Sequence, residues 1–394
     1  MSASKSPLRA PNVRQLVVAQ ATRVVVKVGT RVLVNSKGMP DERRIAALVK
    51  GVAALRHAGK EVVLVTSGAI GSGMEALGLT VRPKTLPELQ MAAAVGQCRL
   101  MSVYQRLFAA EKVCVGQVLL TYDDLRNRLR HLNARNTMLA LLRNGVVPIV
   151  NENDVVSVDE IKVGDNDVLA ALVTTLIQGE LLILLSTTNG LKDISKRPAK
   201  RISFVENVTE RELKLVGAKG SDLSTGGMGS KLRAAQLVVE NGGHVIIADG
   251  RTPRVVASIF EGRDVGTLFG GMREERSDRG RKRWIAYFNR AQGSILVDEG
   301  ARVAIEQRGR SLLPAGVRAV EGKFGKGSVA NIRGLDGTLI ARGLVEYSSE
   351  DLRVIRGRRS SEIQALLGMK DADEVIHRDN MVVLSRAAGV CLER

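Results

Sequence analysis

Short apolar runs that alternate with helical patterns are the feature that most constrains the fold of this chain. The runs are built mainly from Val, Ile and Leu and fall at residues 23–28, 61–65, 115–120, 146–150, 181–185 and 244–247. Strands that are apolar throughout, rather than at alternate positions, are buried on both faces, as in a parallel sheet covered by helices. The pattern therefore predicts an α/β fold, a three-layer αβα sandwich with a mainly parallel sheet.

Composition divides the chain into further parts. Residues 1–22 are a basic N-terminal extension without acidic side chains, for which we favour a plain disordered segment over a transit peptide. Arginines then cluster around residues 273–283, and short strands with many glycines follow them. We expect the α/β domain at 23–270, a basic linker at 271–291, a small β-rich domain at 292–373 and a C-terminal tail at 374–394.

Charge and residue usage narrow the classes of function. Lys and Arg total 59 against 41 Asp and Glu, a net charge of +18, which suits partners that carry phosphate. Aromatic residues make up only 3%, which disfavours a protein whose main role is stacking nucleic-acid bases. No apolar run approaches the roughly 18 residues of a membrane helix. The cysteines, Cys98, Cys114 and Cys391, lie far apart, as expected of a cytoplasmic protein without disulfides.

The polar stretch Asn151–Asp167 follows one apolar run and precedes a helical pattern at Val168–Ile177. Open α/β sheets bind ligands in the crevice beyond the carboxyl ends of their strands. The carboxylates and amides of the stretch could hold a polyol, an ammonium group or a metal ion. The alternative is a solvated loop whose Asn and Asp residues cap turns and the next helix.

Two glycine-rich segments could bind anions. The turn at Ser67–Gly68 would present backbone N–H groups and a hydroxyl, and Ser224–Lys231 would do so at the start of a helix that ends near Asn241. Gly71–Ala76 also matches a dinucleotide fingerprint, but no acid-tipped strand follows about 20 residues on, so we favour the anion-binding turn. Ser224–Lys231 is not the usual P-loop, and a flexible loop with an incidental lysine is its alternative.

Lys27 is a cation within an apolar run, which is costly unless it meets an anion at the end of the strand. Two lysines, two glycine-rich loops and one acidic–amide cluster at strand ends indicate phosphoryl transfer, which needs charge neutralisation and alignment. A carboxylate acceptor would need no general base, since a free Glu titrates near about pH 4.3. None of the four histidines falls in these motifs.

Together these motifs resemble the glutamate 5-kinases of the amino acid kinase family. The matching blocks occur in fixed order at residues 26–30, 65–70, 93–97, 151–154, 164–167 and 225–231. Residues 282–284 and 297–301 also match, and the β-rich domain looks like the PUA domain that many of these kinases carry.

The resemblance implies ATP-dependent phosphorylation of the side-chain carboxylate of L-glutamate to L-glutamyl 5-phosphate, the first step of proline biosynthesis. It implies Mg²⁺ as cofactor, without dedicated metal-ligating residues, proline as a feedback inhibitor and a homo-oligomer, a dimer or tetramer. The alternatives are a related kinase that acts on acetylglutamate or aspartate, and an RNA-binding protein acting through the PUA-like domain.

The resemblance also assigns roles to residues. Lys27 and Lys231 would clamp the transferring phosphoryl group, and Asp167 would orient both lysines. Glutamate would be held by Ser67, Asn151, Asp154, Asp165 and Asn166. ATP would be bound by Lys27, Gly29, Ser186, Thr187, Thr225, Gly226, Gly227, Met228, Gly229, Ser230 and Lys231. Ser186-Thr187 departs from the Thr-Asp usual in the family, which concerns the nucleotide and not the acceptor.

Overall fold

The computed structural model of the chain describes residues 10–34, 40–156, 166–194, 196–215, 227–271, 291–368 and 372–384. The chain forms two compact units, Met1–Arg276 and Ser277–Arg394. No helix among the described residues has the length and apolar character needed to cross a membrane.

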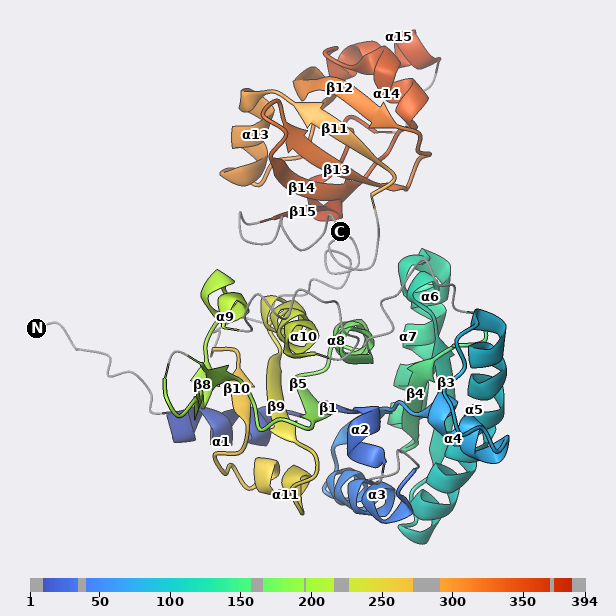
Figure 1. The fold of residues 1–394 in the computed structure, drawn as a ribbon. Coiled ribbons are helices and arrows are strands. Elements are labelled where there is room, and N and C mark those ends of the chain that lie inside the picture. The colour runs from blue at the N-terminus through green and yellow to red at the C-terminus, as the bar shows by residue number, and fades with distance from the viewer. Residues whose placement is uncertain are drawn as a thin grey trace, which may run out of the picture. The chain divides into compact units, whose positions relative to one another are not determined.

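The first unit is built on an eight-stranded sheet in the order β3-β4-β2-β1-β5-β9-β10-β8 (Figure 1). Its strands are β1 (Arg23–Val28), β2 (Glu61–Val65), β3 (Val115–Leu120), β4 (Val147–Glu152), β5 (Leu181–Ser186), β8 (Phe204–Val205), β9 (His244–Asp249) and β10 (Thr267–Phe269). Neighbours pair in parallel except β9 with β10, which confirms the mainly parallel sheet. The chain leaves β1 toward β2 on one side and later returns to β5 on the other, so β1 is a topological switch point.

Helices cover both faces of the sheet, which completes the predicted three-layer sandwich. Helices α8 (Asn166–Leu176) and α10 (Met228–Glu240) lie on one face, and α3 (Glu42–His57) and α11 (Val255–Phe260) lie on the other (Figure 1). The other helices are α1 (Ala10–Gln20), α2 (Thr30–Leu33), α4 (Ala69–Ala76), α5 (Leu86–Ala110), α6 (Tyr122–Arg126), α7 (Arg128–Arg143) and α9 (Glu210–Lys214). A two-stranded sheet, β6 (Lys192–Asp193) with β7 (Lys200–Arg201), follows β5.

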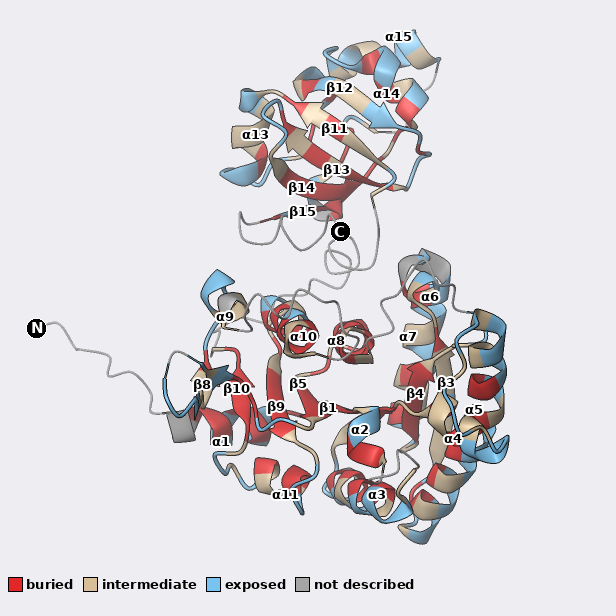
Figure 2. Cartoon of the chain, in the orientation of Figure 1, coloured by how far each residue is buried: buried red, intermediate tan, exposed pale blue. Residues whose placement is uncertain are grey.

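The central strands have no polar face, as their sequences predicted. Val24, Val25 and Val26 of β1 are completely buried, and the neighbouring β5 is buried over Leu181–Leu185 (Figure 2). Burying one such aliphatic side chain stabilises the fold by about 1.5–3 kcal/mol. Within this apolar centre, Lys27 of β1 is 5% exposed, so the sheet carries a buried cation at the carboxyl end of its switch-point strand.

The expectation of a disordered N-terminal extension is wrong from residue 10 onward. Helix α1 buries Val13 and Val17, which are one helical turn apart, in the core of the unit. Arg14 is 2% exposed and donates to the backbone carbonyls of Val265 (2.8 Å) and Gly266 (3.0 Å). The basic residue that suggested a solvated segment is therefore buried between α1 and the loop before β10.

The second unit contains a five-stranded sheet in the order β12-β11-β13-β14-β15, which confirms the β-rich C-terminal part. Its elements are β11 (Gly293–Val297), α13 (Glu299–Glu306), β12 (Val317–Gly322), β13 (Val329–Gly334), β14 (Leu339–Leu344), α14 (Ser349–Ile355), α15 (Ile363–Leu367) and β15 (Met381–Val383). The expected tail at 374–394 is wrong up to residue 384, because Val375 and Ile376 are buried and β15 pairs with β14. Residues 272–290 of the expected linker lie outside the described residues.

Candidate active site

Two lysines meet one aspartate at the carboxyl end of β1. Lys27 Nζ lies 2.5 Å from Asp167 Oδ1, and Lys231 Nζ lies 2.8 Å from Asp167 Oδ2. Ser230 Oγ also donates to Asp167 Oδ2, at 3.1 Å. A strand and the first turns of two helices, α8 and α10, thus bring together residues that are 204 positions apart in the sequence (231 minus 27).

The three groups form a buried cluster with one excess positive charge. Asp167 is fully buried, and Lys27 and Lys231 are each 5% exposed. Burial raises the pKa of Asp167, but the two lysines outweigh that effect and hold the pKa below its ordinary value, so this carboxylate stays ionised. Among the described residues the cluster joins two buried ammonium groups to one carboxylate, and this positive surrounding favours an anionic ligand.

Glycines lie close to these ammonium groups. A Cβ added to Gly29 would lie 3.8 Å from Lys27 Nζ, an ordinary van der Waals contact. Gly227 precedes the first residue of α10, whose N-terminal N–H groups and dipole favour an anion. Gly29, Gly227, Met228, Gly229 and Ser230 therefore lie at strand or helix ends, as predicted, whereas Thr225 and Gly226 are outside the described residues.

Ser186 and Thr187 stand at the carboxyl end of β5, beside the end of β9. In the sheet register Ser186 lies opposite Asp249. Arg251 pairs with Asp249 at 2.7 Å and donates to the backbone carbonyl of Thr187 at 2.8 Å. The Asp249–Arg251 pair was not recognisable in the sequence, and it places a carboxylate on the strand next to Ser186 and Thr187.

A network of amides joins the predicted acceptor-binding residues. Asn166 Nδ2 shares its two hydrogens among three acceptors, the Thr66 carbonyl (2.8 Å), Ser67 Oγ (2.8 Å) and Asn151 Oδ1 (3.2 Å). Asn151 Nδ2 donates in turn to Gln97 Oε1 at 2.9 Å. These hydrogen bonds connect the ends of β2 and β4 with the start of α8. We call the four side chains Ser67, Gln97, Asn151 and Asn166 the amide floor. Its last member, Gln97, received no role from the sequence, although it ends the matching block at 93–97.

Asp154 lies in the turn after β4 and is partly buried. Burial raises its pKa, and the nearby Arg82 offsets part of that rise. A partly desolvated carboxylate of this kind suits a cationic group on a ligand. Asp165, the other predicted carboxylate, lies outside the described residues.

The dinucleotide fingerprint at Gly71–Ala76 has a packing role. These residues lie inside helix α4 and not in the turn between strand and helix. A Cβ at Gly73 would overlap the backbone carbonyl of Ala92 in α5. The turn itself is formed by Gly68, whose φ of +105° is readily adopted by glycine alone.

The described residues fit Mg²⁺ as a companion of the nucleotide. Within the described ranges there is no group of three or more His, Cys, Asp or Glu side chains that could hold a metal ion, and Asp167 is engaged by two lysines. Mg²⁺ usually keeps several waters and binds through one or two carboxylates together with substrate phosphates. An ion carried by a triphosphate needs no protein cage here.

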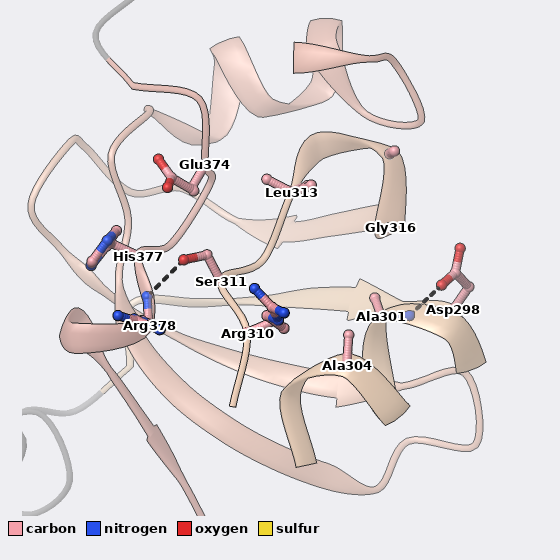
Figure 3. A pocket seen from close by; sticks show the side chains of 11 residues that line it. Asp298, Ala301, Ala304, Arg310, Ser311, Leu313, Gly316, Glu374, His377 and Arg378 are labelled. Carbon is pink, nitrogen blue, oxygen red and sulfur yellow. Dashed lines mark hydrogen bonds between the residues drawn. The ribbon is translucent and has the colours of Figure 1, made fainter. Parts of the chain in front are cut away.

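The second unit has a cavity of about 670 Å³ beside α13 (Figure 3). Charged residues of both signs line it, among them Asp298, Arg310, Glu374 and Arg378. Ser311 Oγ accepts from the backbone N–H of Arg378 at 3.0 Å. The described residues that line this cavity include no Phe, Tyr or Trp, so the cavity lacks the stacking platform that single-stranded RNA recognition commonly uses.

Known proteins are similar to this chain over most of its length. A family model described as "Amino acid kinase family" matches residues 22–249, and one for the PUA domain matches residues 293–367. The chain is 45% identical to "Glutamate 5-kinase" of Syntrophotalea carbinolica over 94% of this chain and 99% of the relative. It is 46% identical to "Glutamate 5-kinase" of Moorella thermoacetica over 94% of this chain and 98% of the relative.

Among solved structures, a carbamate kinase from Giardia lamblia bound to AMP-PNP aligns with a TM-score of 0.47 and 18% identity, covering 64% of this chain and all of that one. The α/β fold and the family match over residues 22–249 are those of an amino acid kinase, and the chain belongs to the amino acid kinase family. Within this family it belongs with the glutamate 5-kinases that carry a C-terminal PUA domain.

Proposed function

We propose that the protein transfers the γ-phosphoryl group of ATP to the side-chain carboxylate of L-glutamate, forming L-glutamyl 5-phosphate and ADP. This is glutamate 5-kinase activity, the first step of proline biosynthesis. The observation that carries the proposal is the buried Lys27–Asp167–Lys231 cluster at the switch point of the sheet, in a chain 45–46% identical to glutamate 5-kinases.

The lysines would act on the phosphoryl group while it moves. A carboxylate oxygen of glutamate attacks the γ-phosphorus, and the bond from that phosphorus to the β–γ bridging oxygen breaks as ADP leaves. The acceptor is ionised at neutral pH, so no proton has to be removed. Lys27 and Lys231 stabilise the negative charge on the transferring group, and Asp167 holds their ammonium groups in place. Bound with ATP, Mg²⁺ would neutralise phosphate charge.

The amide floor would hold glutamate in line with that group. Asn166 uses Nδ2 within the protein, so it offers Oδ1 to the substrate, an acceptor suited to the α-ammonium. Asp154 would pair with the same ammonium. Ser67 Oγ already accepts a bond from Asn166, so its hydroxyl proton can be donated to a carboxylate.

Further partners follow from the same assignment. ATP would extend along Ser186, Thr187 and the start of α10. The Asp249–Arg251 pair, next to Ser186 and Thr187, would place a carboxylate and a guanidinium group near the nucleotide. Proline, the end product of the pathway, would compete with glutamate at the amide floor. We also propose that the protein forms a homo-oligomer. A cytoplasmic location is proposed as well, because Cys98 and Cys114 are free cysteines, as is usual in a reducing compartment.

The two alternatives have less support. Acetylglutamate has no α-ammonium for Asp154 to bind, and aspartate is one methylene shorter than glutamate. RNA binding through the second unit rests on the overall basicity and the PUA match, while the cavity there has mixed charge.

The test measures ATP consumption with glutamate, aspartate and acetylglutamate, with hydroxylamine present to trap any acyl phosphate. We expect turnover and hydroxamate with glutamate at least tenfold above the other two, a difference of about 1.4 kcal/mol in the barrier. Equal rates with all three acceptors would rule out the assignment.

A further inference from the structure

Residues 93–97 form one of the matching sequence blocks, but the proposed mechanism gives none of them a role. The structure shows what constrains two of them. Helices α4 and α5 touch backbone to backbone: a Cβ on Gly96 would overlap the Ala69 carbonyl, and one on Gly73 would overlap the Ala92 carbonyl. Glycine at both positions lets α5 approach this closely. The residue after Gly96 is thereby brought to the carboxyl end of β4, where Gln97 Oε1 meets Asn151.

Hydrogen bonding fixes which end of the Gln97 amide faces Asn151. The Thr66 carbonyl can only accept, so the group that Asn166 directs toward it must be Nδ2. Asn166 Nδ2 also donates to Asn151, which makes the contacting atom of Asn151 its Oδ1. Asn151 Nδ2 then donates to Gln97, so the contacting atom of Gln97 is Oε1. The N–H₂ group is the remaining end of the Gln97 side chain.

That donor has a property unusual for a folded protein. Gln97 Nε2 is buried and has no hydrogen-bond partner among the described residues. Leaving a buried amide donor unsatisfied costs folding free energy, and the large majority of such groups are paired. The unpaired Gln97 Nε2 lies beside the proposed substrate site, and a bound substrate that accepts its hydrogen bond would satisfy it.

The position of Gln97 in the sheet indicates which part of the substrate it meets. Lys27 lies on β1, Ser67 follows β2, Asn151 lies on β4, and Gln97 bonds to Asn151. Because β2 stands between β1 and β4, Gln97 is placed toward the end of the acceptor site remote from the phosphoryl clamp. In glutamate the group remote from the reacting carboxylate that can accept from an N–H₂ is the α-carboxylate.

We propose that Gln97 is a substrate-binding residue whose Nε2 donates to the α-carboxylate of the amino acid acceptor, while its Oε1 holds Asn151. This inference rests on the proposed function. It gives the site a way to favour α-amino acids over acceptors without an α-carboxylate, since such an acceptor leaves the Gln97 donor buried and unpaired.

Two substitutions separate the two ends of the side chain. Gln97→Glu keeps an oxygen for Asn151 but replaces the donor with a second acceptor, which repels a carboxylate. Gln97→Met keeps the length and removes both bonds. Above neutral pH, where Glu is ionised, we expect Gln97→Glu to raise the KM for glutamate roughly a hundredfold and to leave kcat within a few fold.

The matched control is 4-aminobutanoate, which is glutamate without its α-carboxylate. Gln97→Glu should leave kcat/KM for 4-aminobutanoate, followed by hydroxamate formation, within about threefold of wild type. Melting curves of both variants establish the folded fraction on which the rates are calculated.

The inference is overturned if Gln97→Glu keeps the wild-type KM for glutamate, since Gln97 then only supports Asn151. It is also overturned if glutamate and 4-aminobutanoate lose rate equally. If the wild-type enzyme does not phosphorylate glutamate, the proposed function is refuted and this inference with it. If the wild type is active and Gln97→Glu has the same KM for glutamate, the inference alone is refuted.

Discussion

At the scale of single residues, the chain places charged groups where they must be paired. Lys27 was recognisable in the sequence as a cation in an apolar strand, and the structure supplies its anion, Asp167, from a different element. Gln97 was not recognisable as a site residue, because a glutamine within a helical pattern carries no signal. The close approach of α4 and α5 at Gly73 and Gly96 explains why Gln97 reaches the carboxyl end of β4.

Asp167→Asn separates positioning from substrate binding. The amide keeps the shape of the side chain but holds two ammonium groups weakly, so kcat should fall roughly a hundredfold or more while the KM for glutamate stays within a few fold. Loss of the carboxylate that pairs with two buried lysines should also destabilise the fold, by about 3–5 kcal/mol. Steady-state kinetics of the folded fraction, read beside a melting curve, distinguishes the two effects. A normal kcat would refute the role of Asp167.

Asp154 and Asn166 should behave in the opposite way. If both hold glutamate in ground and transition states alike, Asp154→Ala or Asn166→Ala should mainly raise the KM, lowering kcat/KM by about 2–3 kcal/mol. If the variants have a lower melting temperature but wild-type kcat and KM, Asp154 and Asn166 only form turns and helix caps.

The pH dependence of glutamate binding follows from Asp154. Burial raises the pKa of Asp154, so its charge is present above that pKa and is lost at a higher pH than for an exposed aspartate. The KM for glutamate should therefore rise as pH falls through this raised pKa, and Asp154→Asn should remove that rise. Because the folded state binds this proton more tightly than the unfolded state, the ionised carboxylate costs stability at neutral pH, and Asp154→Asn should melt higher there. Parallel KM profiles for wild type and variant would contradict the assignment.

At the scale of elements, the strands could be predicted because short runs that are apolar at every position are typical of buried strands in a parallel sheet. The expected strand at 146–150 is β4, Val147–Glu152, and the expected helix from Asn166 is α8. Helix α1 and strand β15 were missed for one reason: both are short terminal segments whose place is set by tertiary contacts. Propensity and composition do not reveal a buried Arg14 that binds distant carbonyls.

Helix α1 should act on stability and not on catalysis. Arg14→Met removes donors to the carbonyls of Val265 and Gly266 and the 3.2 Å pair with the half-exposed Asp264. Buried carbonyls left unsatisfied should cost about 1–3 kcal/mol, seen as a lower melting temperature. The KM values for glutamate and ATP should not change, because none of the residues that Arg14 binds is a predicted site residue: they are Ser203, Asp264, Val265 and Gly266. A variant that melts like wild type would show that α1 is not a structural part of the unit.

At the scale of the whole molecule, every candidate catalytic residue lies in the first unit, and each unit has a hydrophobic core of its own. Removing Gln292–Arg394 should therefore leave measurable kinase activity. The truncated protein is first shown to fold by circular dichroism. A folded but wholly inactive fragment would contradict a catalytic unit that is complete without the PUA domain.

In the proposed reaction a carboxylate oxygen of glutamate forms the new bond to phosphorus. Glutamate labelled with ¹⁸O in its side-chain carboxylate tests this directly, with hydroxylamine added to release phosphate from the acyl phosphate by attack at carbon. We predict inorganic phosphate that carries one ¹⁸O atom, in amounts equal to the hydroxamate formed. Unlabelled phosphate would mean that water, and not the carboxylate, attacks ATP, and would contradict phosphoryl transfer to glutamate.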